Sequence, residues 1–85
     1  MIEAQHITVR FAPGEGAIGR IVGLVERRGF ELRGLAMAND GPHAALTLDV
    51  AARDAGRKLD ILDLQLRRLI GVHSVSTSPK TGSAS

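Results

Sequence analysis

The fold is decided by residues 7–30, which read ITVRFAPGEGAIGRIVGLVERRGF. From Ile7 to Phe11 apolar and polar residues alternate, which is the period of a strand with one buried face. Residues 13–16, Pro-Gly-Glu-Gly, interrupt this strand. After them the apolar residues recur at about 100° per residue and predict a helix over 17–28, whose apolar face holds Ala17, Ile18, Ile21, Val22, Leu24 and Val25. Gly29 is placed to end this helix in a left-handed conformation, with Phe30 as the hydrophobic contact beyond it.

The rest of the chain repeats this pattern in a different order. Residues 30–38 and 43–50 predict two strands of a hairpin around the turn cluster at 39–42. A second helix is expected from about 57 to 70, with Asp54 as a candidate cap and a core-facing stripe formed by Leu59, Leu62, Leu66, Leu69 and Ile70. Gly71 ends this helix, and residues 72–77 predict a short last strand.

These elements predict an α+β chain with the order strand, helix, strand, strand, helix, strand. Right-handed crossovers in both halves then give a four-stranded antiparallel sheet with two helices on one face, the ferredoxin-like arrangement. The second strand lies at one edge of this sheet. With 85 residues and 9.0 kDa, the chain is expected to form one domain over residues 1–77, followed by a disordered tail over 78–85.

The composition argues against several classes of function. The net charge of +2 arises from basic and acidic residues that are interleaved, and Phe11 and Phe30 are the only aromatic residues, so nucleic acid is not an expected partner. The absence of cysteine excludes disulfides and thiolate metal sites. No apolar run approaches the roughly 18 residues of a membrane span, and no basic leader precedes an apolar core. We therefore expect a cytoplasmic protein without membrane contact.

No group of residues has the spacing of a catalytic or metal site. His6, His43 and His73 lie in three different predicted strands, and none has a second ligand at metal-binding spacing. Asp60 and Asp63 are surrounded by basic residues on the second helix, which is typical of solvated helix charges. The sequence predicts no catalytic residue, no metal and no cofactor in this chain.

The turn formed by Gly14, Glu15, Gly16 and Ala17 is a candidate ligand site. A glycine turn between a strand and a helix frees the first helix amides and lets a ligand approach the backbone, which suits a small anion such as the carboxylate of an amino acid. A tight turn without any ligand is the alternative reading. No Lys follows the last glycine, so the turn does not match a nucleotide phosphate loop.

The predicted edge strand is a candidate surface for a second copy of the chain. Leu32, Leu35 and Met37 accompany its unpaired amides and carbonyls, and pairing with a two-fold mate would make one continuous eight-stranded sheet. Protection of this edge by Glu31 and Arg33 is the alternative.

Two pairs of residues on the helices point to a further docking surface. Ile61 and Leu64 lie opposite the core stripe of the second helix, and Gly19 and Gly23 lie one turn apart on the outward face of the first. Each glycine costs about 1 kcal/mol of helix stability relative to Ala, and the close approach of another surface would account for it.

Four stretches of the chain resemble a known family. They are Ile7–Arg10, Gly16–Leu24, Arg28–Leu32 and Leu66–Val75, and together they are similar to the ACT domain of acetohydroxyacid synthase (acetolactate synthase) small subunits. The resemblance covers roughly Ala4 to Thr77, and the short length is similar to the isozyme 2 type.

The resemblance implies a non-catalytic regulatory subunit of branched-chain amino-acid biosynthesis (valine, leucine and isoleucine). It would bind and activate a large catalytic subunit, which carries thiamin diphosphate, magnesium and FAD. It also implies a homodimer through the second-strand edge, including Arg33 and Met37. An amino-acid effector would be held between one subunit's turn at Gly14–Ala17 and residues Glu31, Leu32 and Leu35 of its mate.

The chain departs from the valine-sensitive members of this family, which carry asparagines at the positions aligned with Pro13 and Glu31. Pro13 offers no amide donor, and Glu31 opposes a ligand carboxylate, so we expect weak or absent valine feedback. A free-standing ACT-type amino-acid sensor is the alternative function. An RNA-binding module would need aromatic residues on the first and third strands, and a small acyl-phosphate hydrolase would need an arginine in the anion-binding turn together with a supporting asparagine.

Overall fold

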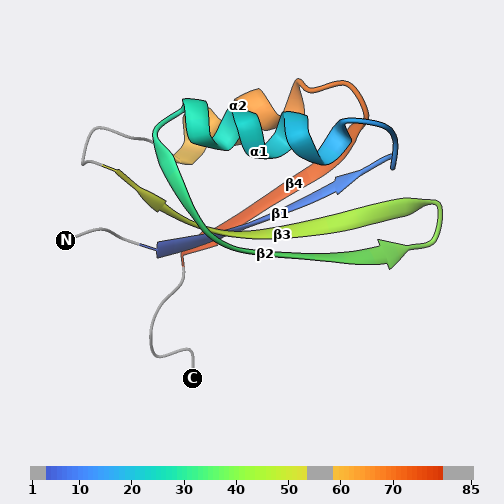
Figure 1. The fold of residues 1–85 in the computed structure, drawn as a ribbon, viewed down its shortest axis with the longest axis horizontal. Helices are drawn as coiled ribbons and strands as arrows, with labels where there is room; N and C mark the ends of the chain where they lie inside the picture. Colours follow the sequence, from blue (N-terminus) through green and yellow to red (C-terminus); the bar gives the residue numbers. More distant parts are fainter. Residues whose placement is uncertain (1–3, 54–58, 80–85) are drawn as a thin grey trace.

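The computed structural model describes residues 4–53 and 59–79 (Figure 1). Along the chain the elements are β1 (Ala4–Phe11), α1 (Ala17–Arg27), β2 (Phe30–Asp40), β3 (His43–Ala52), α2 (Leu59–Arg67) and β4 (Val72–Pro79). This is the predicted order. The candidate cap Asp54 and the expected first turn of the second helix, 57–58, lie outside the described residues, as do residues 80–85 of the predicted tail.

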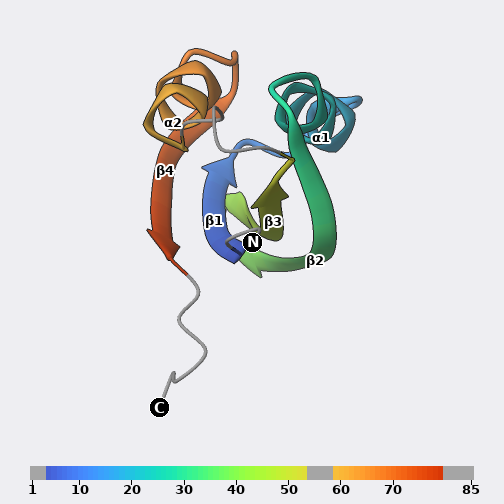
Figure 2. The ribbon, with the colours of Figure 1, turned by 90° about the vertical axis from the view of Figure 1, so that its left-hand side faces the viewer.

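The four strands form one antiparallel sheet with the order β2-β3-β1-β4, so β2 and β4 are its two edges. Figure 2 shows α1 and α2 side by side over the same face of this sheet, and no described helix or strand covers the other face. The predicted ferredoxin-like fold and the edge position of the second strand are therefore confirmed.

The strand register builds rows of side chains that cross the sheet on its helix-covered face. In one row Leu46 of β3 lies between Val9 of β1 and Met37 of β2, and Val9 in turn pairs with Val75 of β4. In the next row Leu48 lies between Ile7 and Leu35. Side chains of directly paired residues point to the same face. Leu35 and Met37 therefore point to the same side as the core.

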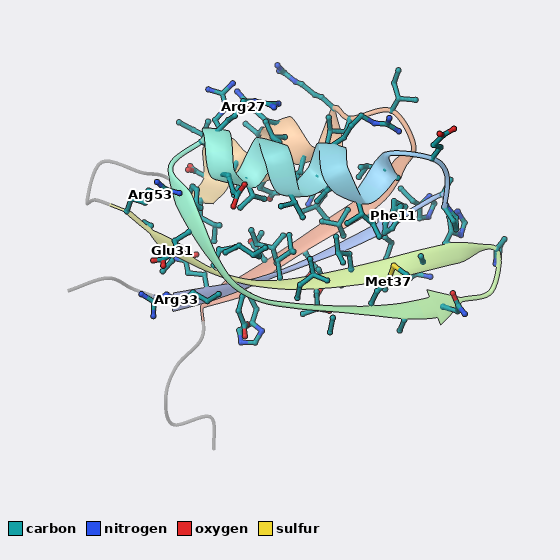
Figure 3. All side chains as sticks on the ribbon, in the orientation of Figure 1. Phe11, Arg27, Glu31, Arg33, Met37 and Arg53 are labelled. Carbon is teal, nitrogen blue, oxygen red and sulfur yellow. The ribbon has the colours of Figure 1, made fainter. Side chains whose placement is uncertain are left out.

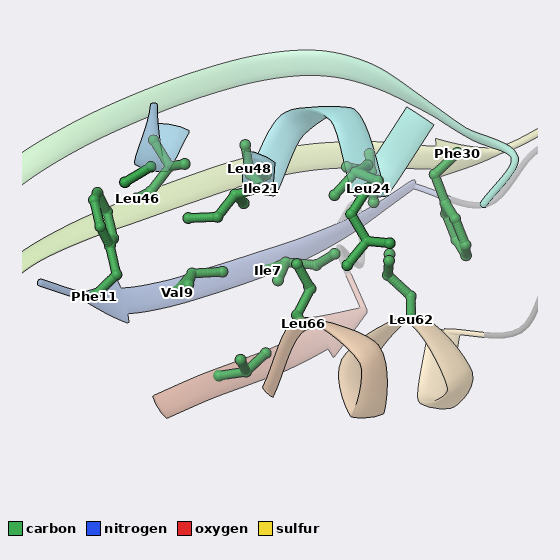
Figure 4. Packing of buried hydrophobic residues seen from close by; sticks show 14 of the residues in the cluster. Ile7, Val9, Phe11, Ile21, Leu24, Phe30, Leu46, Leu48, Leu62 and Leu66 are labelled. Carbon is green, nitrogen blue, oxygen red and sulfur yellow. The ribbon is translucent and has the colours of Figure 1, made fainter. Parts of the chain in front are cut away.

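The core is a single cluster between the sheet and the two helices (Figure 4). Burial alternates strictly along most of β3, as the alternation of its sequence predicts. The largest fully buried side chains are Phe30, Ile7, Ile21, Leu46, Leu48, Leu62 and Leu66.

Glycines with positive φ occupy the ends of both helices. Gly16 (φ 79°) precedes α1 and Gly29 (φ 88°) follows it, and Gly71 (φ 93°) follows α2. The left-handed end predicted at Gly29 is confirmed, and Phe30 beyond it is buried in the core. These residues set the directions in which the chain enters and leaves α1.

Two residues of the predicted apolar faces are not in the core. Ile70 is 92% exposed, because α2 ends at Arg67 and the helical spacing no longer applies in the turn that follows. Ile18 is 37% exposed at the start of α1. The strands are also longer than predicted: β1 begins at Ala4, β2 and β3 end at Asp40 and Ala52, and β4 continues to Pro79. The predicted tail over 78–85 is therefore wrong for residues 78 and 79, which pair with β1.

Candidate functional site

The turn before α1 is exposed and is held by two backbone hydrogen bonds. The amide of Ala17 donates to the carbonyl of Gly14 at 3.2 Å, and the amide of Arg20 donates to that of Gly16 at 3.0 Å. Gly16 is the N-cap residue and makes no side-chain cap, and the first turn of α1 holds no acidic residue. Within α1 itself no anionic side chain offsets the partial positive charge of the first amides, and the carboxylate nearest in sequence is Glu15, in the turn ahead of Gly16.

Arg20 folds back over this turn. A Cβ atom built on Gly16 would lie 3.2 Å from Nη1 of Arg20, so the guanidinium lies against the N-terminal end of the helix. Positive charge at a helix N-terminus is unfavourable by itself, and it becomes favourable when an anion lies beside both groups. Arg20 and the first amides of α1 thus offer positive charge to a carboxylate, and Glu15 contributes one negative charge to the same turn.

The hollow beside the turn is small. Its walls come from the end of β1, the first half of α1, the turn after α2 and the start of β4, and include Phe11, Ile21 and Leu69. Its volume of about 10 Å³ holds roughly one water molecule. A wider depression of about 520 Å³, next to Arg20 and Arg68, is open to solvent. One chain alone therefore does not enclose an amino-acid side chain here.

An apolar strip runs along the edge of the sheet at β2. Leu35 and Met37 are 48% and 52% exposed although they point to the helix-covered side. Arg20 lines the hollow together with Leu69, so it lies on the side of α1 that faces α2. Ile18 is two residues before Arg20, about 200° away around the helix, and therefore lies on the flank of α1 toward β2. We call Ile18, Leu35 and Met37 the edge strip.

The first residues of β2 carry charges. Glu31 and Arg33 form an exposed ion pair with 3.4 Å between Oε1 and Nη2. The register of β2 against β3 shifts between Leu32 and Gly34, so Arg33 occupies a bulge. Figure 3 shows Glu31 and Arg33 near Arg53 at one end of the sheet, whereas Phe11 and Met37 lie toward the other end.

The candidate ligand residues are therefore divided between the two ends of α1. The turn at Gly14–Ala17 precedes the helix, and Glu31 and Leu32 follow it; the 11 residues of α1 span about 16 Å. Leu35, the remaining candidate, lies between the two ends on β2. Within one subunit the structure does not bring the turn together with Glu31.

At the opposite edge of the sheet, one backbone carbonyl of β4 is capped by a side chain. Nη2 of Arg67 donates to the carbonyl of Val75 at 2.7 Å, and Nε of the same residue lies 2.8 Å from Oδ1 of Asp63. The sequence reading placed Asp63 and Arg67 on a solvated helix face. The structure gives Arg67 a second role, because it occupies a backbone acceptor of an edge strand.

Three of the four predicted outward residues of the helices, Gly19, Ile61 and Leu64, are exposed, and Gly23 is half-buried. Ile61 is 48% and Leu64 is 57% exposed. A Cβ atom on Gly19 would meet nothing within 4 Å, and one on Gly23 would meet only Nη1 of Arg27, at 3.5 Å. Packing within the described part of the chain thus gives no reason for glycine at either position.

Two histidine contacts were not anticipated from the sequence. Nδ1 of His6 lies 3.0 Å from Oδ1 of Asp49, and the rings of His43 and His73 have their centroids 4.8 Å apart. The contact of His6 with Asp49 depends on the strand register, which pairs these residues across β1 and β3 and which residue spacing alone does not give. Among the residues that the structure describes, no group of three or more His, Cys, Asp or Glu is placed to hold a metal ion.

None of the described helices is long and apolar enough to cross a membrane. A four-stranded sheet with two helices on one face, a glycine turn ahead of the first helix and an apolar edge strip together define a small regulatory or ligand-binding module. The family model of the ACT domain matches residues 13–75, so the chain belongs to the ACT domain family. ACT domains are regulatory or amino-acid-binding modules, not catalytic ones.

Solved structures with the same fold share little sequence with this chain. The ACT domain of a GTP pyrophosphokinase from Chlorobium tepidum has a TM-score of 0.74 at 17% identity, covering 92% of this chain and 100% of that one. The C-terminal domain of the MgtC protein from Mycobacterium tuberculosis has a TM-score of 0.72 at 23% identity, covering 93% and 88%. An ACT domain protein from Streptococcus pneumoniae has a TM-score of 0.76 at 11% identity, covering 100% and 98%. No curated protein sequence matches the chain at a significant level.

Proposed function

We propose that this chain is a regulatory subunit that pairs through the β2 edge, binds an amino-acid effector between the paired subunits, and activates the large catalytic subunit of acetolactate synthase. The observation that carries the pairing is the contrast between an apolar β2 edge and a β4 edge occupied by Arg67. The resemblance of Ile7–Arg10, Gly16–Leu24, Arg28–Leu32 and Leu66–Val75 to acetolactate synthase small subunits supports the choice of catalytic partner.

Pairing would bring the divided ligand residues together. Two β2 strands that pair antiparallel about a two-fold axis run in opposite directions. With Leu35 on the axis and a bulge at Arg33, the partner's Glu31 lies opposite Ala38 or Asn39, which pair with Ala45 and Ala44 of β3. Ala44 in turn pairs with Phe11. Phe11 is the last residue of β1 before the turn. The partner's Glu31 would thus approach the end of the molecule that carries the turn at Gly14–Ala17.

The paired arrangement would also enclose the ligand. The hollow beside the turn is too small for an amino-acid side chain in one subunit, and the second subunit would supply the missing wall. The first amides of α1 and Arg20 would bind the carboxylate. Glu31 pairs with Ala51 and so points away from the helix-covered face; the partner's Glu31 would reach the ligand's ammonium group only by extending around the edge of the sheet.

Valine is expected to bind weakly or not at all. Pro13 has no amide proton, and Glu31 stands where valine-sensitive relatives carry asparagine. Calorimetric titration of the wild-type chain should show no heat of valine binding in the micromolar range. The double variant Pro13→Asn/Glu31→Asn should gain measurable affinity, whereas Glu26→Asn, which removes an exposed carboxylate from α1, should not. Micromolar binding of valine by the wild type would contradict this part of the proposal.

The docking surface for the catalytic subunit is proposed on the outer side of the helices. Ile61 and Leu64 offer apolar contacts on α2, and Gly19 and Gly23 leave the backbone of α1 accessible. In this proposal thiamin diphosphate, magnesium and FAD belong to the catalytic partner. Activation would follow from tighter binding to the partner's active conformation.

Co-purification with a candidate large subunit, followed by rate measurements with and without this chain, tests the proposed function. We expect activation by the wild-type chain, and loss of both binding and activation in Leu64→Asp. Ser76→Asp is the control, because Ser76 is an exposed residue of β4 that lies outside both the proposed surface and the hollow beside the turn. Amino-acid binding without any effect on a synthase would favour the free-standing sensor.

A further inference from the structure

His43 and His73 form a cluster that the proposed regulatory function does not use. Their rings have centroids 4.8 Å apart and planes inclined by 28°. His73 is exposed and His43 is half-buried. Across residues 4–53 and 59–79, neither ring makes a hydrogen bond or an ion pair, so their nitrogens are available to a ligand.

The sheet brings these two residues together across the end of β1. His43 begins β3 immediately before Ala44, the partner of Phe11. On the other side of β1 the pairing with β4 passes from Arg10–Ser74 to Phe11–Val72, so His73 is the extra residue of a bulge. A bulge redirects its side chain. β1 lies between β3 and β4 and ends at Phe11. Past Phe11, no residue of β1 stands between the ring of His43 on β3 and the ring of His73 on β4.

We propose that His43 and His73 form a two-histidine site for a late first-row transition-metal ion such as Cu²⁺, Ni²⁺ or Zn²⁺. Imidazole nitrogen is a good ligand for these ions. With metal–nitrogen distances of about 2.0–2.1 Å and square-planar or tetrahedral angles, two imidazoles on one ion have centroids roughly 4.5–5.2 Å apart. The observed 4.8 Å lies within this interval. The two rings are stacked in this structure, and rotation about the last side-chain torsion, which is broad for histidine, would have to turn them out of the stack to aim one nitrogen of each ring at the ion.

The site would hold an exchangeable ion. The described residues provide no third His, Cys, Asp or Glu at this point, so water completes the coordination. Arg10, paired with Ala45 and Ser74 on the adjoining stretch of β1, adds a positive charge that lowers the affinity for a cation. Affinity should follow the usual order in which Cu²⁺ binds more tightly than Ni²⁺ or Zn²⁺. A bound ion would link β3 to β4 across the end of β1 and stabilise the fold in proportion to its occupancy.

The test is a titration of the purified chain with copper, nickel or zinc chloride, followed by nuclear magnetic resonance of the histidine side chains. Cu²⁺ should broaden the signals of His43 and His73 together, with one equivalent bound per chain, and should leave His6 unaffected at that point. Zn²⁺ should raise the melting temperature, and a chelator should reverse the increase.

His43→Gln and His73→Gln should each weaken Cu²⁺ binding at least ten-fold. His6→Gln is the matched control, since His6 contacts Asp49 and lies elsewhere on the sheet. Far-ultraviolet circular dichroism checks that each variant is folded. Undiminished binding in either single variant, equal loss in His6→Gln, or no binding by the wild type would overturn the proposal.

Discussion

The two edge strands of the sheet, β4 and β2, differ in the side chains that accompany their free backbone groups. At β4 the guanidinium of Arg67 donates to the carbonyl of Val75, and Asp63 holds that guanidinium in place. At β2 the apolar side chains of Leu35 and Met37 lie half-exposed, and the Glu31–Arg33 pair joins two side chains of the same strand without capping a backbone group. A protected edge and an apolar edge in one sheet favour pairing through one side only.

This difference bears on what kind of assembly the chain forms. A sheet with two available edges can add copies at both, which produces an open array. A sheet with one available edge pairs about a two-fold axis and the assembly is then closed. The ligand site proposed between paired subunits needs the closed form, because each turn must meet one partner edge.

The largest effect is expected when charge is placed on the edge strip. In Leu35→Lys/Met37→Lys, like charges face each other across the two-fold axis and apolar contact is lost, so dimerisation should weaken roughly 100-fold. Sedimentation equilibrium measures the dissociation constant. Ile61→Lys/Leu64→Lys changes two exposed apolar residues of α2, away from the edge, and should leave the dissociation constant of the dimer unchanged. If Leu35→Lys/Met37→Lys dimerised like the wild type, the subunits would not pair through β2.

The next effect is expected when the β4 edge is released. Arg67→Ala removes the hydrogen bond to Val75 and the contact with Asp63, which should lower the free energy of unfolding by about 1–2 kcal/mol. The freed edge should also yield species larger than a dimer as the concentration rises, measured by light scattering after gel filtration. Arg68→Ala is the control, because its exposed side chain neighbours Arg67 in sequence but does not contact β4. Identical assembly in the two variants would show that Arg67 does not limit pairing.

The features that depend on local periodicity could be predicted from the sequence. The alternation along β3, the left-handed end of α1 at Gly29 and the exposure of Ile61 and Leu64 all follow from residue spacing within one element. The exposure of Ile70 was missed because periodicity does not say where a helix stops.

Contacts between residues of different elements could not be predicted, because the residue pattern within one strand or helix does not give the strand order or register. The meeting of His43 and His73 requires both the strand order and a bulge of one residue in β4. The hydrogen bond from Arg67 to Val75 requires the placement of α2 against β4. For the candidate ligand site, the turn and the edge strand could be found from composition. The fold was needed to show that the 11 residues of α1 hold the turn and Glu31 apart within one subunit.

A smaller effect is expected beside the bulge of β2. A Cβ atom on Gly34 would lie 3.1 Å from Oδ2 of Asp49, whose other oxygen contacts His6. Gly34→Ala should therefore displace Asp49 and destabilise the chain by about 1 kcal/mol, measured by urea unfolding. Combining it with Asp49→Ala should remove the penalty, because the two residues are in contact. If Gly34→Ala alone stabilised the chain, Asp49 would move aside without cost, and glycine would not be needed at position 34 to accommodate the Asp49 side chain.

The smallest effect is expected from the ion pair on β2. Glu31 and Arg33 are each 52% exposed and 3.4 Å apart, and exposed pairs of this kind contribute little because water screens them. Glu31→Gln should change the free energy of unfolding by less than about 0.5 kcal/mol and leave the dissociation constant of the dimer within about two-fold. Urea unfolding and sedimentation equilibrium measure the two quantities. A large increase in self-association would instead mean that the charge of Glu31 restrains pairing at β2, and the two edges would then differ in degree of protection rather than in kind.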